Sequence, residues 1–119
     1  MPIKYIEYKG RKILYVDFSN MTGDQAIATL DEEAREMQNW TEKGIVLNVF
    51  YNSKATTEFM AHAKKLGKEL FIRTIHKSAA VGLTGIQMVL LQAYNTFSRD
   101  KLTPFKTEEE AKEWLIKED

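Results

Sequence analysis

The chain has 119 residues, which suits one compact domain, and an apolar fraction of 44% supplies an ordinary hydrophobic core. Seventeen basic residues balance seventeen acidic ones, which excludes a global positive field of the kind that holds nucleic acid or an anionic membrane. The lack of cysteine excludes disulfides, thiol catalysis and thiolate metal sites, and it is typical of a reducing cytoplasm. We therefore expect one cytoplasmic domain over residues 1–119, with no transmembrane segment.

A β-hairpin is expected at the start of the chain. Residues 4–8 and 11–18 are rich in β-branched and aromatic side chains, which favour strands. They meet at Lys9-Gly10, where glycine permits a tight reversal. The first strand is therefore predicted to be antiparallel to the second.

Helices and strands then alternate. Residues 27–37 carry apolar side chains at spacings of three and four, which predicts an amphipathic helix. Residues 45–51 carry apolar side chains at both odd and even positions, as expected of a strand covered on both faces. A second helix is predicted over residues 56–71, and a third covered strand is predicted over residues 78–83.

The last third of the chain continues this alternation. A third helix is expected to begin at Thr84 or Gly85, and residues 102–105 form a short strand whose proline favours a sheet edge. Thr107 and Glu110 make a capping box, in which each side chain satisfies an amide at the start of the final helix. Three residues of that helix should point inward: Ala111, Trp114 and Leu115.

This order predicts an α/β fold. Strands that alternate with helices of such length imply right-handed crossovers and parallel neighbours. We expect a mixed, mostly parallel sheet of four to five strands with four helices around it and an antiparallel first strand.

The same order, together with the stretches "ILYVDFSN", "KSAAVGLTGIQMVLLQAYN" and "TPFKTEEEAKEWL", resembles the SpoIIAA-like family, relatives of STAS domains. The chain is also similar to the CRAL-TRIO lipid-binding group. The resemblance covers essentially all 119 residues. It implies a SpoIIAA/STAS-like sheet and no cofactor.

The resemblance also implies a candidate switch after the third strand. In STAS antagonists of anti-sigma factors, a serine in an Asp-Ser-Ser-Gly-like turn is phosphorylated at this point. Here the stretch reads "YNSKATTEF", with Ser53 near the expected place and Asn52 where the motif has aspartate. Ser53, Thr56 and Thr57 are phosphorylation candidates, because a phosphate would lie near a helix N-terminus. Alternatively, these hydroxyls cap the helix.

The turn "GLTG" at residues 82–85 has two interpretations. Free amides of a helix start, placed at the carboxyl end of a strand, can bind a phosphate or a carboxylate. Glycine also permits the close approach of strand and helix at a tight corner without any ligand. The glycine patterns of phosphate loops and dinucleotide sites are absent. The candidate ligand-binding or anion-binding residues are Ser53, Thr56, Gly82, Thr84 and Gly85.

The third predicted helix is apolar around most of its circumference. Such a helix must be covered on more than one side, by another helix, a second subunit or an apolar ligand. Met88 and Leu91 lie off the expected core stripe, and methionine suits adaptable surfaces, so we expect both in a homodimer contact. The expected stripe itself consists of Ile86, Val89, Leu90, Ala93, Tyr94 and Phe97.

Signals of catalysis and of metal binding are poor. His62 and His76 lack the spacing of a zinc helix, and no Gly-x-Ser-x-Gly elbow occurs. We interpret His62 as a partly buried structural residue and Asp17 as a hydrogen-bonded strand end. A basic cluster is expected to be a solvated helix face or, alternatively, a surface for an acidic partner or lipid headgroup: Lys64, Lys65, Lys68, Arg73, His76 and Lys77.

These observations favour a non-enzymatic STAS-like regulatory or protein-interaction module without a metal or a cofactor. The alternative is a carrier domain for a small apolar or amphipathic molecule or lipid. Such a ligand would lie between the third helix and its neighbours, with an acidic head in an anion site near Thr84 and Gly85.

Overall fold

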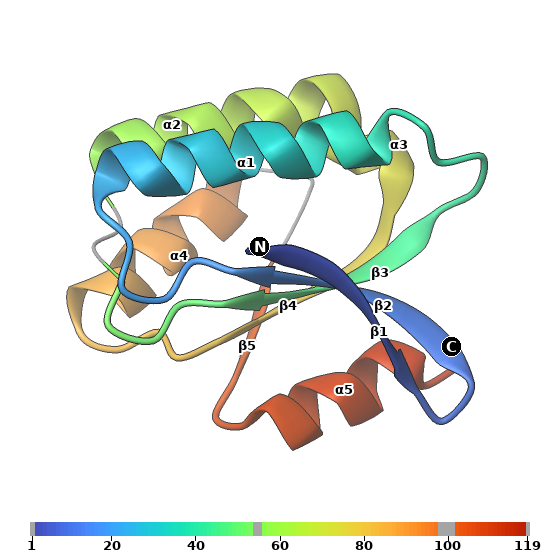
Figure 1. Cartoon of the computed structure of the whole chain (residues 1–119). Helices are drawn as coiled ribbons and strands as arrows, with labels where there is room; N and C mark the ends of the chain where they lie inside the picture. The colour runs from blue at the N-terminus through green and yellow to red at the C-terminus, as the bar shows by residue number, and fades with distance from the viewer. Residues whose placement is uncertain (1, 54–55, 98–101, 119) are drawn as a thin grey trace.

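The computed structural model describes residues 2–53, 56–97 and 102–118, and within these residues five strands form one sheet (Figure 1). The sheet order is β1-β2-β3-β4-β5; β1 is antiparallel to β2, and the other neighbours are parallel. The predicted mixed sheet is confirmed. The strands are β1 (Ile3–Tyr8), β2 (Arg11–Asp17), β3 (Gly44–Val49), β4 (Ile75–Val81) and β5 (Thr103–Phe105).

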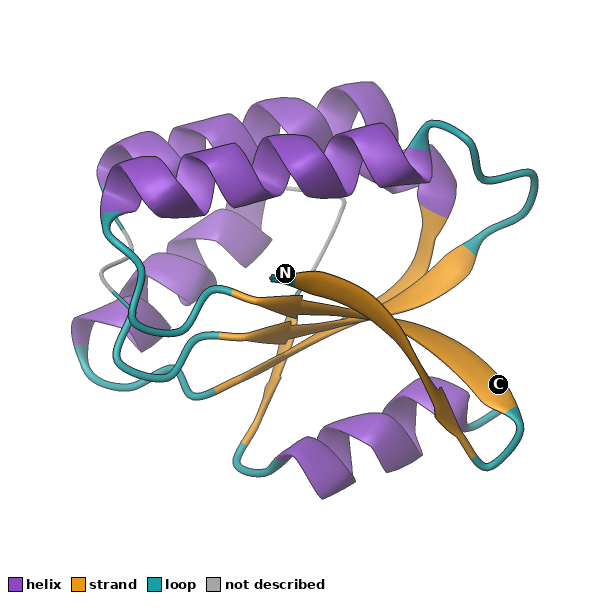
Figure 2. Ribbon diagram, in the orientation of Figure 1, coloured by secondary structure: helices purple, strands orange, loops and turns teal. Residues whose placement is uncertain are grey.

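Helices cover both faces of the sheet (Figure 2). In the same described part of the chain, α1, α2 and α4 lie over one face, and α5 lies over the other (Figure 1). The second helix, predicted as one segment, is α2 followed by a π-helical turn and a short α-helical turn. The bounds are α1 (Gly23–Met37), α2 (Thr57–Leu66), η1 (Gly67–Phe71), α3 (Ile72–Thr74), α4 (Ile86–Phe97) and α5 (Glu108–Ile116).

The hairpin between β1 and β2 is confirmed. Lys9 and Gly10 both have positive φ angles, 48° and 82°, as a two-residue reversal of this kind requires. The strand ends pair directly across it, Tyr8 with Arg11. Turn chemistry alone was sufficient to predict this element.

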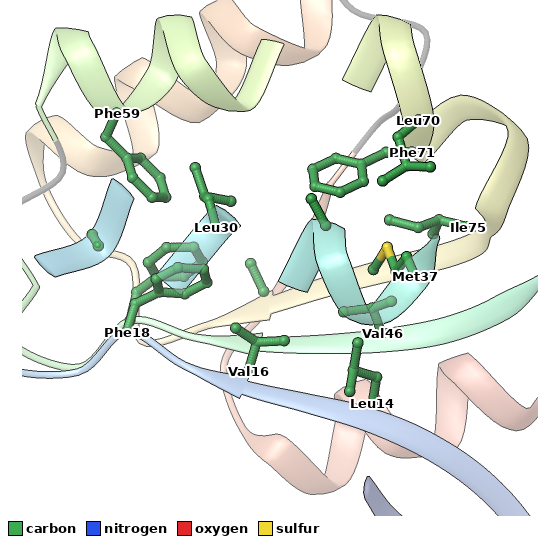
Figure 3. Close-up of a cluster of buried hydrophobic side chains, with 14 residues drawn as sticks. Leu14, Val16, Phe18, Leu30, Met37, Val46, Phe59, Leu70, Phe71 and Ile75 are labelled. Atoms are coloured by element: carbon green, nitrogen blue, oxygen red, sulfur yellow. The ribbon is translucent and has the colours of Figure 1, made fainter. Parts of the chain in front are cut away.

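Alternation along β3 and β4 divides their side chains between the two faces. Val46 and Ala80 face α1 and α2, whereas Leu47 and Val81 face α5. On the first face, the ring of Phe18 stacks on another phenylalanine at 4.9 Å. Figure 3 shows this cluster in two parts, with Phe18, Leu30 and Phe59 at one end and Met37, Phe71 and Ile75 at the other.

Strand β4 begins at Ile75, three residues before the predicted start. The prediction placed Lys77 in an exposed basic cluster, but Lys77 is buried against α5. Its Nζ donates to the carbonyls of Trp114 at 3.0 Å and Lys117 at 2.8 Å, at the end of that helix. A lysine is tolerated inside because the apolar stem packs while backbone oxygens bind the ammonium.

Helix α4 is rotated relative to the predicted orientation. Ile86 and Val89, expected in the core, are 69% and 57% exposed, and Ala93 is exposed as well. Leu91 was expected at a subunit contact but is 3% exposed and faces inward. Met88 is half-buried. Of the other expected core residues, Leu90 and Tyr94 are half-buried, and the side chain of Phe97 lies outside the described part.

Two amide side chains explain this rotation. Gln87 Nε2 donates to the carbonyl of Ser53. Asn95 Nδ2 donates to the Leu102 carbonyl at 2.9 Å, and Asn95 Oδ1 accepts the Leu102 amide at 2.9 Å. Because α4 is apolar on most sides, hydrophobicity does not choose its inner face, and these polar contacts decide it.

The final helix differs from its prediction only at its cap. Thr107 Oγ1 accepts the amide of Glu110 at 3.1 Å, as expected. The Glu110 carboxylate, however, accepts the Thr107 hydroxyl at 3.2 Å, and we expected it to accept the backbone amide. Ala111 and Leu115 are buried as predicted, and Trp114 is half-buried.

Candidate functional site

The two turns that carry the predicted ligand residues lie at the same edge of the sheet. Strands β3 and β4 are parallel, and the amide of Phe50 donates to the carbonyl of Val81 at 2.9 Å just beyond them. Gln87, in the first turn of α4, reaches back to the carbonyl of Ser53. We call this edge the carboxyl rim, defined by residues 50–53 and 82–85.

The candidate hydroxyls at the first turn of the carboxyl rim and at the start of α2, which follows it, have different surroundings. Thr56 Oγ1 accepts the amide of Phe59 at 3.1 Å and so caps α2. The Thr56 side chain also packs on the start of α1, where a Cβ at Gly23 would lie 2.9 Å from Thr56 Cγ2. Ser53 is half-buried, and Thr57 is exposed.

At the second turn, the two glycines differ. Gly82 has φ 85°, and a Cβ there would lie 2.8 Å from the backbone nitrogen of Tyr51, so the close approach of two backbones requires glycine. Gly85 has φ 56° and open space around its Cα. Thr84 is exposed and shares a depression of about 430 Å³ with Lys106 and Met88. The tight corner accounts for Gly82, and Gly82 and Thr84 both border the open depression, whereas Gly85 does not line it.

A second hollow lies between the sheet and the helices α1, α2 and α4. It is a cavity of about 60 Å³. Both the helices and the sheet contribute apolar walls to it, among them Phe18, Leu30, Phe59, Phe71, Ile75 and Leu91.

Three polar residues also line this cavity, although they are buried. Glu33 of α1 is 2% exposed, Asn48 of β3 is 6% exposed and Ser78 of β4 is 5% exposed. Asn48 Nδ2 donates to Ser78 Oγ at 3.0 Å and to the carbonyl of Ala79 at 3.1 Å. We call Glu33, Asn48 and Ser78 the polar wall.

The sequence analysis missed the polar wall, although signals were present. Glu33 lies three residues after Leu30 and one before Ala34, so helical periodicity puts its carboxylate on the buried stripe. Asn48 interrupts an otherwise apolar strand. A carboxylate or an amide inside an apolar pattern indicates a buried polar group with a specific role.

The residues considered as possible acids or bases make contacts that support the fold. His62 Nε2 lies 2.7 Å from Asp31 Oδ1 and joins α2 to α1. Asp17 Oδ1 accepts the amide of Ser19 at 2.9 Å at the end of β2. His76 is exposed. Among residues 2–53, 56–97 and 102–118, no three histidines or carboxylates are grouped as a metal site would need.

Tyrosines and carboxylates join α5 to the hairpin. The Tyr8 hydroxyl donates to Glu113 at 2.9 Å and to Glu109 at 3.2 Å, and the bond to Glu113 is the main cause that raises the pKa of Tyr8 to about 12. Burial, with the nearby carboxylate of Glu108, raises the pKa of Tyr15 to about 12. Hydrogen bonds from Lys9 and then Tyr8 lower the pKa of Glu113. This cluster holds two elements together.

None of the described helices is long and apolar enough to span a bilayer. No family model and no curated protein matches the sequence.

Among solved structures, the chain is similar to an uncharacterized protein of the DUF3478 family with a SpoIIAA-like fold, from Shewanella loihica PV-4. The TM-score is 0.72 at 14% sequence identity, and the match covers 96% of this chain and 92% of that chain. The expected SpoIIAA-like fold is therefore confirmed.

Proposed function

We propose that this SpoIIAA-like chain acts as a single STAS-like domain, a non-enzymatic regulatory or protein-interaction module of the cytoplasm. The observation that carries the proposal is the outer face of α4, where Ile86 and Val89 expose large apolar side chains. Covering such side chains removes apolar surface from water and stabilises a complex. Tyr51, also exposed, lines the depression at the carboxyl rim together with Met88.

We propose a second copy of the chain as the partner. A two-fold dimer brings the same patch of each copy together, so an apolar helix face suits it. The half-buried Met88 adds an adaptable side chain beside Thr84. The predicted contact thus keeps Met88 and replaces the buried Leu91 by Ile86 and Val89.

Phosphorylation would be a means of control at this surface. The Ser53 carbonyl accepts a hydrogen bond from Gln87 of α4, so a phosphate on Ser53 would act next to the contact that orients the helix. A phosphate on Thr56 would remove the cap of α2. Thr57 is exposed and would accept a phosphate without losing a cap.

Sedimentation velocity over a range of protein concentrations tests the dimer. We expect a concentration-dependent dimer for the natural chain and a monomer for the double variant Ile86→Lys, Val89→Lys. Ile72→Lys, the same kind of change at an exposed apolar position on α3, is the control and should still dimerise. A natural chain that stays monomeric at its highest soluble concentration would refute the homodimer.

A second candidate function is that of a carrier for a small apolar or amphipathic molecule, and the cavity beneath α4 favours it. The depression with Thr84 and Lys106 would then be an anion site at the start of α4. Native mass spectrometry of freshly purified protein separates the two functions. A co-purifying small molecule supports the carrier, whereas a dimer of unmodified mass supports the interaction module.

A further inference from the structure

The cavity beneath α4 is unusual for a protein interior, where side chains normally pack as densely as an organic crystal. At about 60 Å³ it exceeds the roughly 10–15 Å³ that a cavity needs to hold one water. Drug-sized ligands need at least about 300 Å³. The space therefore suits a molecule of a few heavy atoms.

The polar wall decides which chemistry such a molecule would carry. Both hydrogen bonds of Asn48 use its Nδ2 donor, which leaves its Oδ1 as an acceptor toward a guest. Glu33 adds the oxygens of a carboxyl group, which accept hydrogen bonds when ionised. Ser78 already accepts the Asn48 amide. Acceptor oxygens therefore predominate at this side of the cavity.

We infer that the cavity beneath α4 binds a small aliphatic molecule with one hydroxyl or amino group, whose donor meets Glu33 and Asn48. The inference deepens the carrier function and rests on it. It also changes the head group that we expected, because an ionised acid has no donor to offer the acceptor oxygens of Glu33 and Asn48. The apolar part of the guest would contact Phe59 and Leu91.

Four-carbon probes of matched size test this inference. We would titrate ¹⁵N-labelled protein with 1-butanol, butylamine, butyrate and diethyl ether and follow the amide signals of residues that line the cavity. Diethyl ether has the same atoms as 1-butanol but no donor. Because the ether cannot donate this hydrogen bond, we expect 1-butanol to bind about two- to tenfold more tightly than the ether. We expect butylamine to bind and butyrate not to bind.

Variants show where the probes bind. Leu91→Phe fills the cavity from within and should abolish binding of 1-butanol, whereas Gln92→Phe, the same change at the exposed neighbouring position, should leave it intact. Glu33→Gln keeps the shape and exchanges one acceptor oxygen for a donor group. It should weaken binding of butylamine and permit binding of butyrate.

The possible results distinguish the donor inference from the carrier function. Equal binding of 1-butanol and diethyl ether, lost in Leu91→Phe, would overturn the donor inference and leave the carrier function standing. Binding of butyrate to the natural chain would overturn it as well. Failure of all four probes, together with native mass spectra free of any small molecule, would overturn the carrier function itself. The comparison of alcohol with ether needs no variant, so it holds even if Glu33→Gln does not fold.

Discussion

The two faces of the sheet are built differently. Of the described helices, α5 alone covers one face, and the buried cluster there contains Leu47, Val81 and Leu115. Three helices cover the other face, yet it is this face that holds the cavity and the buried residues Glu33 and Asn48. A face that is covered by more helices is therefore not packed more densely. The cavity and polar groups of the α4 face are the basis of the binding that we propose, whereas we expect the α5 face to contribute mainly stability.

The strongest test of this contrast compares two leucines. Leu115→Ala on the α5 face removes a fully buried side chain and should lower the free energy of unfolding by about 4 kcal/mol. Leu91→Ala adjoins an existing cavity, so fewer contacts are lost, and we expect about 2 kcal/mol. Urea denaturation of both variants measures the difference. Equal losses would contradict the contrast between the faces.

A second test addresses the buried lysine of the α5 face. Lys77→Met keeps the apolar stem and removes the two hydrogen bonds to the end of α5. Since hydrogen bonds to charged groups contribute about 1.5–3 kcal/mol, we expect a loss of about 2 kcal/mol in urea denaturation. Lys68→Met, an exposed position on η1, is the control and should change little. An unchanged midpoint for Lys77→Met would show that the ammonium contributes nothing net.

A third test adds volume to each face. Ala63→Leu should fill part of the cavity and stabilise the fold by about 1 kcal/mol. The same change at Ala111, which is fully buried beneath α5, should destabilise it by about 2 kcal/mol through overpacking. Thermal unfolding measures whether each variant is more or less stable than the natural chain. A destabilising Ala63→Leu would mean that the cavity cannot accept added atoms.

The smallest expected effect is a loss of stability at alkaline pH, caused by two tyrosines near α5. The pKa values of Tyr8 and Tyr15 are raised from 10.0 to about 12, so folding favours their protonated forms. This stabilisation is complete below pH 10 and is lost as the pH rises toward 12. Absorbance of tyrosinate should show one late-ionising tyrosine fewer in Tyr8→Phe than in the natural chain. Ionisation of both Tyr8 and Tyr15 near pH 10 would contradict the contacts with α5.

Much of the fold could be predicted because local signals agreed with one another. Lys9-Gly10 specified the hairpin, and apolar residues at both parities specified β3. The orientation of α4 could not be predicted, since its apolar residues surround the helix and the decisive contacts of Gln87 and Asn95 are with backbone groups outside the helix. Lys77 was misplaced because a charged residue predicts exposure unless its partners are known.

The candidate site was predicted less well than the fold. The carboxyl rim followed from parallel strand order alone, and the structure brings Ser53 close to α4 there. The cavity depends on how three helices fit over one sheet, which no single segment of sequence records. Glu33, on the buried stripe of α1, and Asn48, inside an apolar strand, were the signals that could have pointed to it.

The outermost strands have a consequence for the behaviour of the protein at high concentration. Strand β5 is three residues long and carries Pro104, which lacks an amide donor. Strand β1, at the opposite margin, exposes the charged side chains of Lys4 and Glu7. Neither margin presents a long, flat row of free backbone groups to a neighbouring molecule. The edges of the sheet are therefore poorly suited to pair with strands of another copy and to start a fibre.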